Sequence, residues 1–174
     1  MTNKTIIALT GPKGVGKTTI AREIEARDWG NRCILSFAEP LRRMVSQLIP
    51  MSLMTDPDRK EQPLEWMGGK SPRQLLQSLG TDWGRDMVSE TIWIDAMRRM
   101  IPDQSFDVII IDDCRFENEA QMVRDMGGIV VGLERDGIAY TGEHKSETPV
   151  QADAIIDASV IDLAGDAIEQ LLQE

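Results

Sequence analysis

The chain has 174 residues, with 19 Lys plus Arg against 29 Asp plus Glu and a formal net charge of −10. A chain of this length buries about 70% of its unfolded-state surface, so it can build a core without disulfides or structural metal. The acidic balance disfavours extended binding to nucleic-acid polymers. A local basic pocket for one phosphorylated small molecule stays compatible with it.

The two cysteines, Cys33 and Cys114, lie far apart and form no C-x-x-C pattern. This argues against a zinc site and fits a reducing compartment in which both are ordinary thiols. The apolar run near the N-terminus is too short for a signal peptide or a membrane span. We therefore expect a cytoplasmic protein that does not bind membranes.

Short apolar runs alternate with helical patterns along the chain, and no repeat or linker-like block divides it. We expect a single domain over residues 1–174. The expected strands are 5–10, 33–37, 107–113, 129–133 and 154–157, and the expected helices are 17–27, 40–49, 72–79, 92–100, 116–126 and 163–172. The alternation predicts a doubly wound α/β fold with a parallel sheet, whose ligands lie at the carboxyl ends of the strands.

Some segments have more specific expectations. The run 107–113 contains consecutive branched aliphatic residues, which predicts a strand buried on both faces at the centre of the sheet. Residues 50–69 show no regular pattern. Gly80 is expected to end the helix over 72–79, before a polar turn over 81–85. Residues 134–150 are expected to form a polar loop.

The segment from Gly11 to Thr18 reads G-P-K-G-V-G-K-T and lies between an expected strand and an expected helix. It fits the pattern G-x-x-x-x-G-K-[ST] of phosphate-binding loops (P-loops), whose glycines let backbone N–H groups surround phosphate oxygens. Lys17 supplies a cation for the terminal phosphates, and the Thr18 hydroxyl is suited to Mg²⁺. We expect ATP to bind at Gly11, Lys13, Gly14, Val15, Gly16, Lys17, Thr18 and Thr19.

Asp112 and Asp113 stand at the end of the most apolar expected strand. An acid at the tip of a buried strand can hold Mg²⁺ or its waters beside a P-loop. The same acids could instead cap the helix that begins near residue 116. We expect at least one of them to serve the metal, and the spacing does not choose between them.

A triphosphate site alone does not define where the phosphate goes. The chain has no N-K-x-D for guanine recognition, and it is short for a motor or an oligomeric ATPase. A small-molecule kinase needs arginines near the strand ends to neutralise two sets of phosphates. Arginines follow expected strands or turns at Arg42, Arg43, Arg73, Arg85, Arg115 and Arg135, which favours such a kinase.

Further motifs are S-F-A-E-P-L-R at 36–42, L-L-Q-S-L-G-T-D-W-G-R at 75–85, D-D-C-R-F-E-N-E-A at 112–120 and H-K-S-E at 144–147. Together with the P-loop they resemble the bacteriophage-type deoxynucleoside monophosphate kinases, within the P-loop nucleoside monophosphate kinase group. The resemblance implies a five-stranded parallel sheet of order 2-3-1-4-5. It also implies an acceptor-binding helical segment at about 38–101 and a lid at about 134–150.

The resemblance further implies transfer of the γ-phosphoryl group of ATP to a deoxynucleoside monophosphate, with Mg²⁺ as cofactor. Lys17, Arg115 and Arg135 are the expected catalytic residues. The expected lid contains Arg135 and Lys145 but no arginine-dense run, so the identity of the lid cation stays open. The acceptor is expected to contact Glu39, Arg42, Arg73, Gln77, Asp82, Trp83, Asp113 and Arg115.

Two other functions stay open. Dephospho-coenzyme A kinases are similar in size and P-loop, but they typically show D-A-D where this chain has Phe37-Ala38-Glu39-Pro40. A nucleotide-binding switch or assembly ATPase with a protein partner would not produce ADP in response to a small acceptor. The sequence does not choose the base, the sugar or the oligomeric state, and a homodimer is compatible with it. If the chain is phage-encoded, the expected location is the host cytoplasm.

Overall fold

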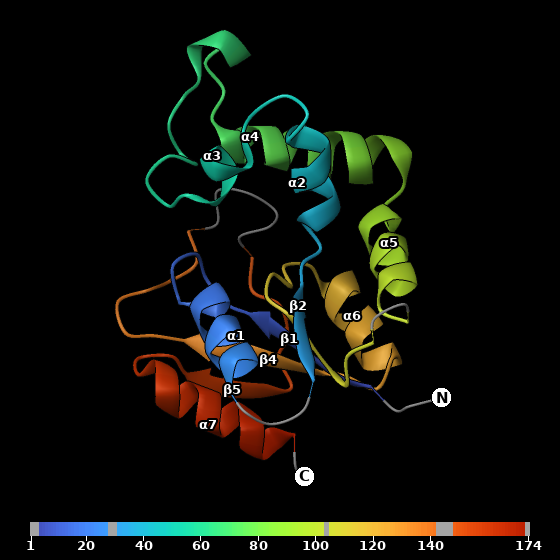
Figure 1. Cartoon of the computed structure of the whole chain (residues 1–174), viewed down its shortest axis with the longest axis vertical. Coiled ribbons are helices and arrows are strands. Elements are labelled where there is room, and N and C mark those ends of the chain that lie inside the picture. The colour runs from blue at the N-terminus through green and yellow to red at the C-terminus, as the bar shows by residue number, and fades with distance from the viewer. Residues whose placement is uncertain (1–3, 28–30, 103–104, 142–147, 173–174) are drawn as a thin grey trace. The chain divides into compact units, whose positions relative to one another are not determined.

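The computed structural model describes residues 4–27, 31–102, 105–141 and 148–172. The chain forms two compact units, one from residues 1–36 and 103–174 and the other from residues 37–102 (Figure 1). The second unit is thus inserted into the sequence of the first. It has nearly the bounds of the expected acceptor-binding segment, 38–101.

The first unit contains a five-stranded parallel sheet with the strand order β2-β3-β1-β4-β5. Ile7 of β1 lies opposite Ile110 of β3 and Ile129 of β4, so apolar strands form the centre. The predicted fold class and strand order are confirmed. The central strand is β1 and not β3 as expected; β3 lies next to it and is buried as predicted. The strands are β1 (Thr5–Thr10), β2 (Arg32–Leu35), β3 (Val108–Ile111), β4 (Ile129–Glu134) and β5 (Ala154–Asp157).

Helices cover both faces of this sheet. α1 (Lys17–Ala26) and α7 (Ile161–Leu171) lie side by side (Figure 1). Ile20 of α1 and Ile168 of α7 share one apolar core with Leu9 of β1. α6 (Glu117–Asp125) contacts β1 and β4. A Cβ at Gly128 would meet both Val123 of α6 and the Ile6 side chain. Ile6 and Ile7 point to opposite faces of the sheet, so α6 packs on the face opposite to the α1–α7 core.

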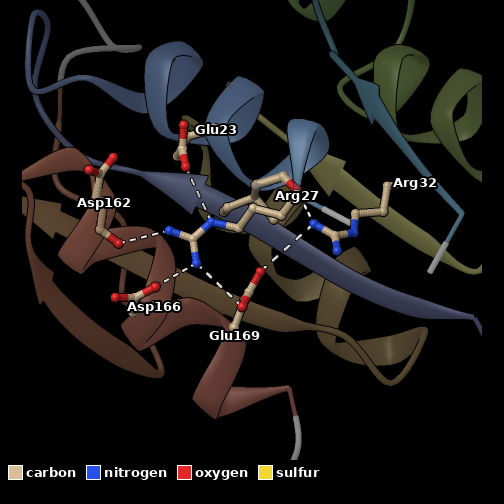
Figure 2. Close-up of polar contacts among 7 residues, drawn as sticks. Glu23, Arg27, Arg32, Asp162, Asp166 and Glu169 are labelled. Atoms are coloured by element: carbon tan, nitrogen blue, oxygen red, sulfur yellow. Dashed lines mark hydrogen bonds and ion pairs between the residues drawn. The ribbon is translucent and has the colours of Figure 1, made fainter. Parts of the chain in front are cut away.

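A cluster of ion pairs, which we call the α1–α7 ion cluster, joins the end of α1 to α7 (Figure 2). The Arg27 guanidinium lies 2.6 Å from Asp166, 3.3 Å from Glu169 and 3.3 Å from Glu23. It also donates to the Asp162 carbonyl oxygen at 2.8 Å. The pKa of Arg27 is raised, first by its hydrogen bond with Asp166. The carboxylates of this cluster therefore neutralise Arg27 and join α1 to α7.

Arg32 also belongs to this cluster, and Gly165 packs against it. Arg32, the first residue of β2, is buried, donates to the Ile24 carbonyl oxygen, and lies 3.9 Å from Glu169 (Figure 2). Gly165 of α7 leaves room for Arg27, because a Cβ at Gly165 would lie 2.5 Å from Arg27 Nη2. The glycine within this helix is thus explained by close packing, although glycine weakens a helix.

The second unit is helical. A core of Val45, Ile49, Leu53 and Met54 lies within it. No helix in the described ranges of the chain is both long and apolar enough to cross a lipid bilayer. The elements of the second unit are α2 (Glu39–Val45), α3 (Met51–Thr55), α4 (Pro72–Gln77), α5 (Ile92–Met100), a 3₁₀ turn η1 (Glu65–Met67) and a π-helix η2 (Ser78–Val88).

The structure corrects the expected pattern around Pro50. The helix predicted over 40–49 ends at Val45, and the chain tightens into turns in which Leu48 N–H donates to the Val45 carbonyl oxygen. Pro50 disfavours helical geometry at Ile49, so the turns after Val45 do not run on as one helix into α3. Residues 50–69 are not irregular throughout, because α3 begins after Pro50 and buries Leu53. A five-residue helix is too short to show a periodic pattern.

The prediction that Gly80 ends a helix is wrong. α4 continues into η2, which includes the predicted turn at 81–85. Trp93 Nε1 donates to the Gly80 carbonyl oxygen at 2.8 Å, and a Cβ at Gly80 would lie 3.4 Å from Leu41. At Gly84 a Cβ would lie 2.6 Å from the Trp93 ring. Both glycines therefore serve the packing of Trp93 and α2 against η2.

Candidate active site

The loop between β1 and α1 has the backbone that the P-loop pattern predicts. Gly11, Gly14 and Gly16 have φ values of +142, +84 and +112°, a region that disfavours residues with a Cβ. A Cβ at Gly11 would also lie 2.6 Å from the Leu133 carbonyl oxygen. Conformation and space both require glycine there. Val15 is buried in the core, whereas Lys13, Gly14, Thr18 and Thr19 are exposed.

Lys17 is the first residue of α1, and its ammonium group bends back to the loop. Nζ donates to the carbonyl oxygens of Gly11 at 2.5 Å and Pro12 at 2.9 Å. The first turn of α1 contains no acidic residue. The positive end of the helix dipole and its first N–H groups therefore reinforce the charge of Lys17. This arrangement suits a bound polyphosphate.

The structure separates the two acids that follow β3. Thr18 Oγ1 donates to Asp112 Oδ2 at 2.8 Å, whereas Ser36 Oγ donates to Asp113 Oδ2 at 2.6 Å. Both acids are buried, with 7% of Asp112 and 6% of Asp113 exposed. Asp112 is therefore the acid beside the P-loop. Ser36 lies inside the expected strand 33–37 and was not singled out from the sequence. The observed β2 ends at Leu35, so Ser36 follows β2 as the two acids follow β3.

Arg115 lies in the turn that leads from β3 to α6 and is half-buried. The residue before it, Cys114, donates its N–H to the Leu9 carbonyl oxygen at 3.2 Å. Burial raises the pKa of the Cys114 thiol, and the carboxylate of Glu119 raises it further. Cys33 and Cys114 are both buried free thiols, as the sequence predicts. Arg115 thus follows both acids in the same turn. The buried thiol of Cys114, which lies between them and Arg115, stays unreactive.

A pocket of about 580 Å³ lies beside the P-loop in the first unit, within the size range of small-molecule sites. Arg135, the predicted lid cation, is exposed and lines it, and a β-bridge pairs Arg135 with Ile138. Hydrogen bonds from Ser159 lower the pKa of Asp157, with a smaller contribution from Arg135. The lining includes Pro12, Arg135, Ile138, Tyr140, Ile155 and Asp157. Apolar and charged side chains of the first unit therefore line the same pocket.

Only part of the predicted lid can be placed. Residues 134–141 and 148–150 belong to the described ranges. Lys145 and the H-K-S-E motif at 144–147 lie outside the described residues.

The second unit carries the remaining predicted substrate residues. Glu39 lies 3.7 Å from Arg42 and 2.9 Å from Arg43. Arg73 of α4 lies 3.5 Å from Glu61. Arg42 and Arg73 therefore each have a carboxylate neighbour, and Glu39, predicted to contact the acceptor, contacts two arginines.

Gln77 is the last residue of α4, and Asp82 and Trp83 lie in η2. The Trp83 ring centroid lies 6.4 Å from that of Trp93, while 38% of Trp83 remains exposed. Trp83 therefore packs on one side and offers aromatic surface on the other.

The sheet, the glycine loop and Lys17 define a P-loop kinase fold. An APS kinase of Mycobacterium tuberculosis superposes with a TM-score of 0.55 and 11% identity, with 100% of both chains covered. Shikimate kinase from Aquifex aeolicus gives a TM-score of 0.54 and 11% identity, covering 97% of this chain and 96% of the other. At this identity the likeness concerns the fold alone.

The family model for deoxynucleotide monophosphate kinase matches residues 69–171. A protein of Acanthamoeba polyphaga mimivirus, whose name includes the words deoxynucleotide monophosphate kinase, is 30% identical over 164 residues, which covers 84% of this chain and 82% of that protein. The deoxynucleoside-5'-monophosphate kinase of Escherichia phage T5 is 35% identical over 89 residues, which covers 47% of this chain and 36% of that enzyme. The chain therefore belongs to the deoxynucleotide monophosphate kinase family, and the predicted resemblance is confirmed.

Proposed function

We propose that the protein transfers the γ-phosphoryl group of ATP to a deoxynucleoside monophosphate, giving the diphosphate and ADP. The observation that carries this proposal is the site at the start of α1, where Lys17 lies over the glycine loop and Thr18 bonds Asp112. Such a site binds a nucleoside triphosphate. Membership of the family supplies the class of acceptor.

Lys17 would stabilise the charge that develops during transfer. Catalysis of phosphoryl transfer consists mainly of positioning and electrostatic stabilisation, because the protein forms no covalent bond with the phosphoryl group. The ammonium group would exchange the carbonyl oxygens of Gly11 and Pro12 for phosphate oxygens. Loop N–H groups and the start of α1 would hold the remaining oxygens.

Thr18 and Asp112 are the proposed residues for Mg²⁺. A hydroxyl and a carboxylate, 2.8 Å apart, are the hard oxygen donors that this ion prefers. The described residues contain no group of three or more His, Cys, Asp or Glu that could hold a metal, so phosphate oxygens and water would complete the coordination. When bound, the ion neutralises charge on the transferring phosphates. Asp113, held by Ser36, is proposed to contact substrate.

The acceptor phosphate is proposed to bind Arg42 and Arg73, with help from Arg115. The arginine fork binds phosphate oxygens in pairs, and the carboxylates of Glu39 and Glu61 hold the first two guanidinium groups in place. Sugar and base contacts are proposed for Glu39, Gln77, Asp82 and Trp83. The exposed part of Trp83 is suited to stacking on a base.

The pocket beside the P-loop is proposed to take the base and ribose of ATP. Pro12 belongs both to the P-loop and to the pocket lining, so phosphates on the loop would lead directly into this volume. Ile138, Tyr140 and Ile155 supply apolar surface. Arg135, which lines this pocket, is proposed to reach the ATP phosphates when the proposed lid, residues 134–150, closes and excludes water.

The proposed setting is the cytoplasm, or the host cytoplasm if the chain is phage-encoded, and a homodimer is compatible with the proposal. Both cysteines are free thiols, which fits a reducing compartment. The net charge of −10 fits small phosphorylated substrates better than nucleic-acid polymers.

The test is to incubate the protein with ATP and Mg²⁺ and with each deoxynucleoside or ribonucleoside monophosphate in turn. We expect at least one deoxynucleoside monophosphate to stimulate ADP formation and to yield its diphosphate. ADP formation that no monophosphate stimulates would contradict the proposal and favour an ATPase or switch. Stimulation by dephospho-coenzyme A alone would favour the other kinase class.

A further inference from the structure

One buried carboxylate, that of Glu119, fixes the turn between β3 and α6. Glu119 Oε2 accepts hydrogen bonds from the backbone N–H of Arg115 at 2.7 Å and of Phe116 at 3.1 Å. The N–H of Glu119 in turn donates to the Phe116 carbonyl oxygen at 3.0 Å. Side chain and backbone therefore close a ring of hydrogen bonds over residues 115–119.

The carboxylate of Glu119 is buried, so its position needs a physical reason. Only 2% of Glu119 is exposed, and a carboxylate that leaves water needs strong partners. Two N–H donors and the positive end of α6 supply them, since Glu119 lies in the first turn of that helix. An exposed Ser or Asp at the N-cap would start a helix without this desolvation, whereas the N-cap here is Phe116. Glu119 therefore fixes the backbone at Arg115, which precedes α6.

The rest of the turn is anchored to the sheet. Asp112 N–H donates to the Leu35 carbonyl oxygen of β2 at 3.2 Å, and Cys114 N–H donates to the Leu9 carbonyl oxygen of β1 at 3.2 Å. Strands therefore hold the start of the turn, and Glu119 holds its end. The segment so fixed carries both acids of the site and Arg115.

We infer that Glu119 is a positioning residue for phosphoryl transfer, which fixes the backbone from which Arg115 reaches the transferred group. This inference rests on the proposed function and on the role of Arg115 in it. In this proposal Glu119 acts through the backbone of Arg115 and not by contact with a substrate.

The first test is a double-mutant cycle of Glu119→Ala with Arg115→Ala. We expect Glu119→Ala to lower kcat about tenfold and to change the KM for ATP by less than about twofold, the scale of misplacing one stabilising donor. Because the effect passes through Arg115, Glu119→Ala should lower kcat by less than about twofold when Arg115 is already alanine. Equal losses in both backgrounds would overturn the inference.

Conservative variants separate the hydrogen bonds from charge and from folding. Glu119→Gln keeps an acceptor oxygen at the same reach and should bring kcat to within about threefold of the unmodified protein. Glu119→Asp keeps the charge but shortens the reach, and should lose activity like Glu119→Ala, which it replaces in the cycle if the alanine variant does not fold. Full activity in Glu119→Asp would overturn the inference.

The matched control is Glu117→Gln. Glu117 is the exposed first-turn acid of the same helix, and its carboxylate lies 3.2 Å from Arg124. It contributes the same charge to the start of α6, but its carboxylate bonds Arg124 and the Gln151 N–H instead of the 115–116 backbone, so kcat should not change. A loss like that of Glu119→Ala would mean that the helix charge alone matters, which would overturn the inference.

Amide hydrogen exchange provides a readout that does not depend on activity. Exchange at Arg115 and Phe116 should be faster in Glu119→Ala and Glu119→Asp than in the unmodified protein, and unchanged in Glu117→Gln. If no acceptor stimulates turnover in the unmodified protein, the proposed function fails while the exchange result still reports on the turn. Equal exchange in all variants would overturn the positioning role alone.

Discussion

The two ends of helix α1 both carry a cation, and their surroundings differ. At its start, Lys17 donates to the carbonyl oxygens of Gly11 and Pro12, in a loop without acidic residues. Just past its end, Arg27 lies within 3.3 Å of carboxylates from Glu23, Asp166 and Glu169. Carbonyl groups of the loop bind the first cation, whereas carboxylates of α1 itself and of α7 neutralise the second.

This difference separates a site from a structural clamp. Phosphate oxygens can replace carbonyl oxygens around Lys17 with a gain of charge attraction, because the carbonyls carry no net charge. Arg27 would have to give up ion pairs in a partly buried place to bind any other anion. Under the proposed function, Lys17 at the start of α1 binds substrate, whereas Arg27, just past the end of α1, serves the packing of α1 on α7.

The largest expected effect is at Lys17. Lys17→Ala should lower acceptor-dependent kcat/KM by about a thousandfold or more, because it removes a cation that faces developing charge. The melting temperature should change by less than about 2 °C, since Lys17 fills no core. Steady-state ADP formation and thermal unfolding measure the two effects. Arg22→Ala, an exposed arginine on the same helix, is the control, and near-normal activity of Lys17→Ala would refute the assignment.

At the other end of α1, Arg27→Met should reduce the free energy of unfolding by about 1–3 kcal/mol, because it leaves the carboxylates of the α1–α7 ion cluster without their shared cation. The side chain is 17% exposed, so solvent moderates the loss. Denaturant unfolding measures it, with Arg22→Met as the control, expected within about 0.5 kcal/mol. The kcat should stay within about twofold. A catalytic loss in Arg27→Met without a loss of stability would erase the contrast between the two ends.

Arg135 extends the comparison to an exposed cation in the pocket wall. Arg135→Ala should lower kcat about tenfold, the scale of losing one stabilising donor, and should leave the melting temperature nearly unchanged because the side chain is exposed. Rapid-quench kinetics and thermal unfolding separate the two quantities. An unaltered kcat would mean that another cation, such as Lys145 or Arg115, serves the transferred group.

The smallest expected effect sharpens the structural side of the comparison. Gly165→Ala places a Cβ 2.5 Å from Arg27 Nη2, and should cost about 1 kcal/mol despite the better helix propensity of alanine. In the Arg27→Met background the sign should reverse to a gain of about 0.5 kcal/mol, because the obstacle is gone and the propensity remains. Denaturant unfolding of the four proteins decides this. The same loss in both backgrounds would mean that Arg27 is not what Gly165 accommodates.

The parts of the molecule that could be predicted from sequence are those fixed by local patterns. The apolar run Val108–Ile111 could only be an interior strand, and it is one. The P-loop backbone follows from its glycines and flanking elements. The order of the strands was predicted from the family resemblance, and the structure confirms it.

What the sequence could not predict depends on contacts between distant residues. Asp112 and Asp113 are equivalent in sequence, and only the fold brings Thr18 to one and Ser36 to the other. Glycine is common where helices end, so Gly80 was expected to end one. The hydrogen bond from Trp93 Nε1 to the Gly80 carbonyl oxygen, a tertiary contact, overrides that preference. The role of Glu119 was missed because its partners are backbone N–H groups, which no side-chain motif displays.

The most direct measurement follows the γ-phosphate itself. ATP labelled at the γ position is incubated with Mg²⁺, the protein and each deoxynucleoside monophosphate, and the products are separated. Transfer to a small acceptor predicts label in the β position of a deoxynucleoside diphosphate, in an amount equal to the ADP formed, and about a thousandfold less of this product in the same time with Lys17→Ala. Label found only in inorganic phosphate, or bound to protein, would contradict the proposed function.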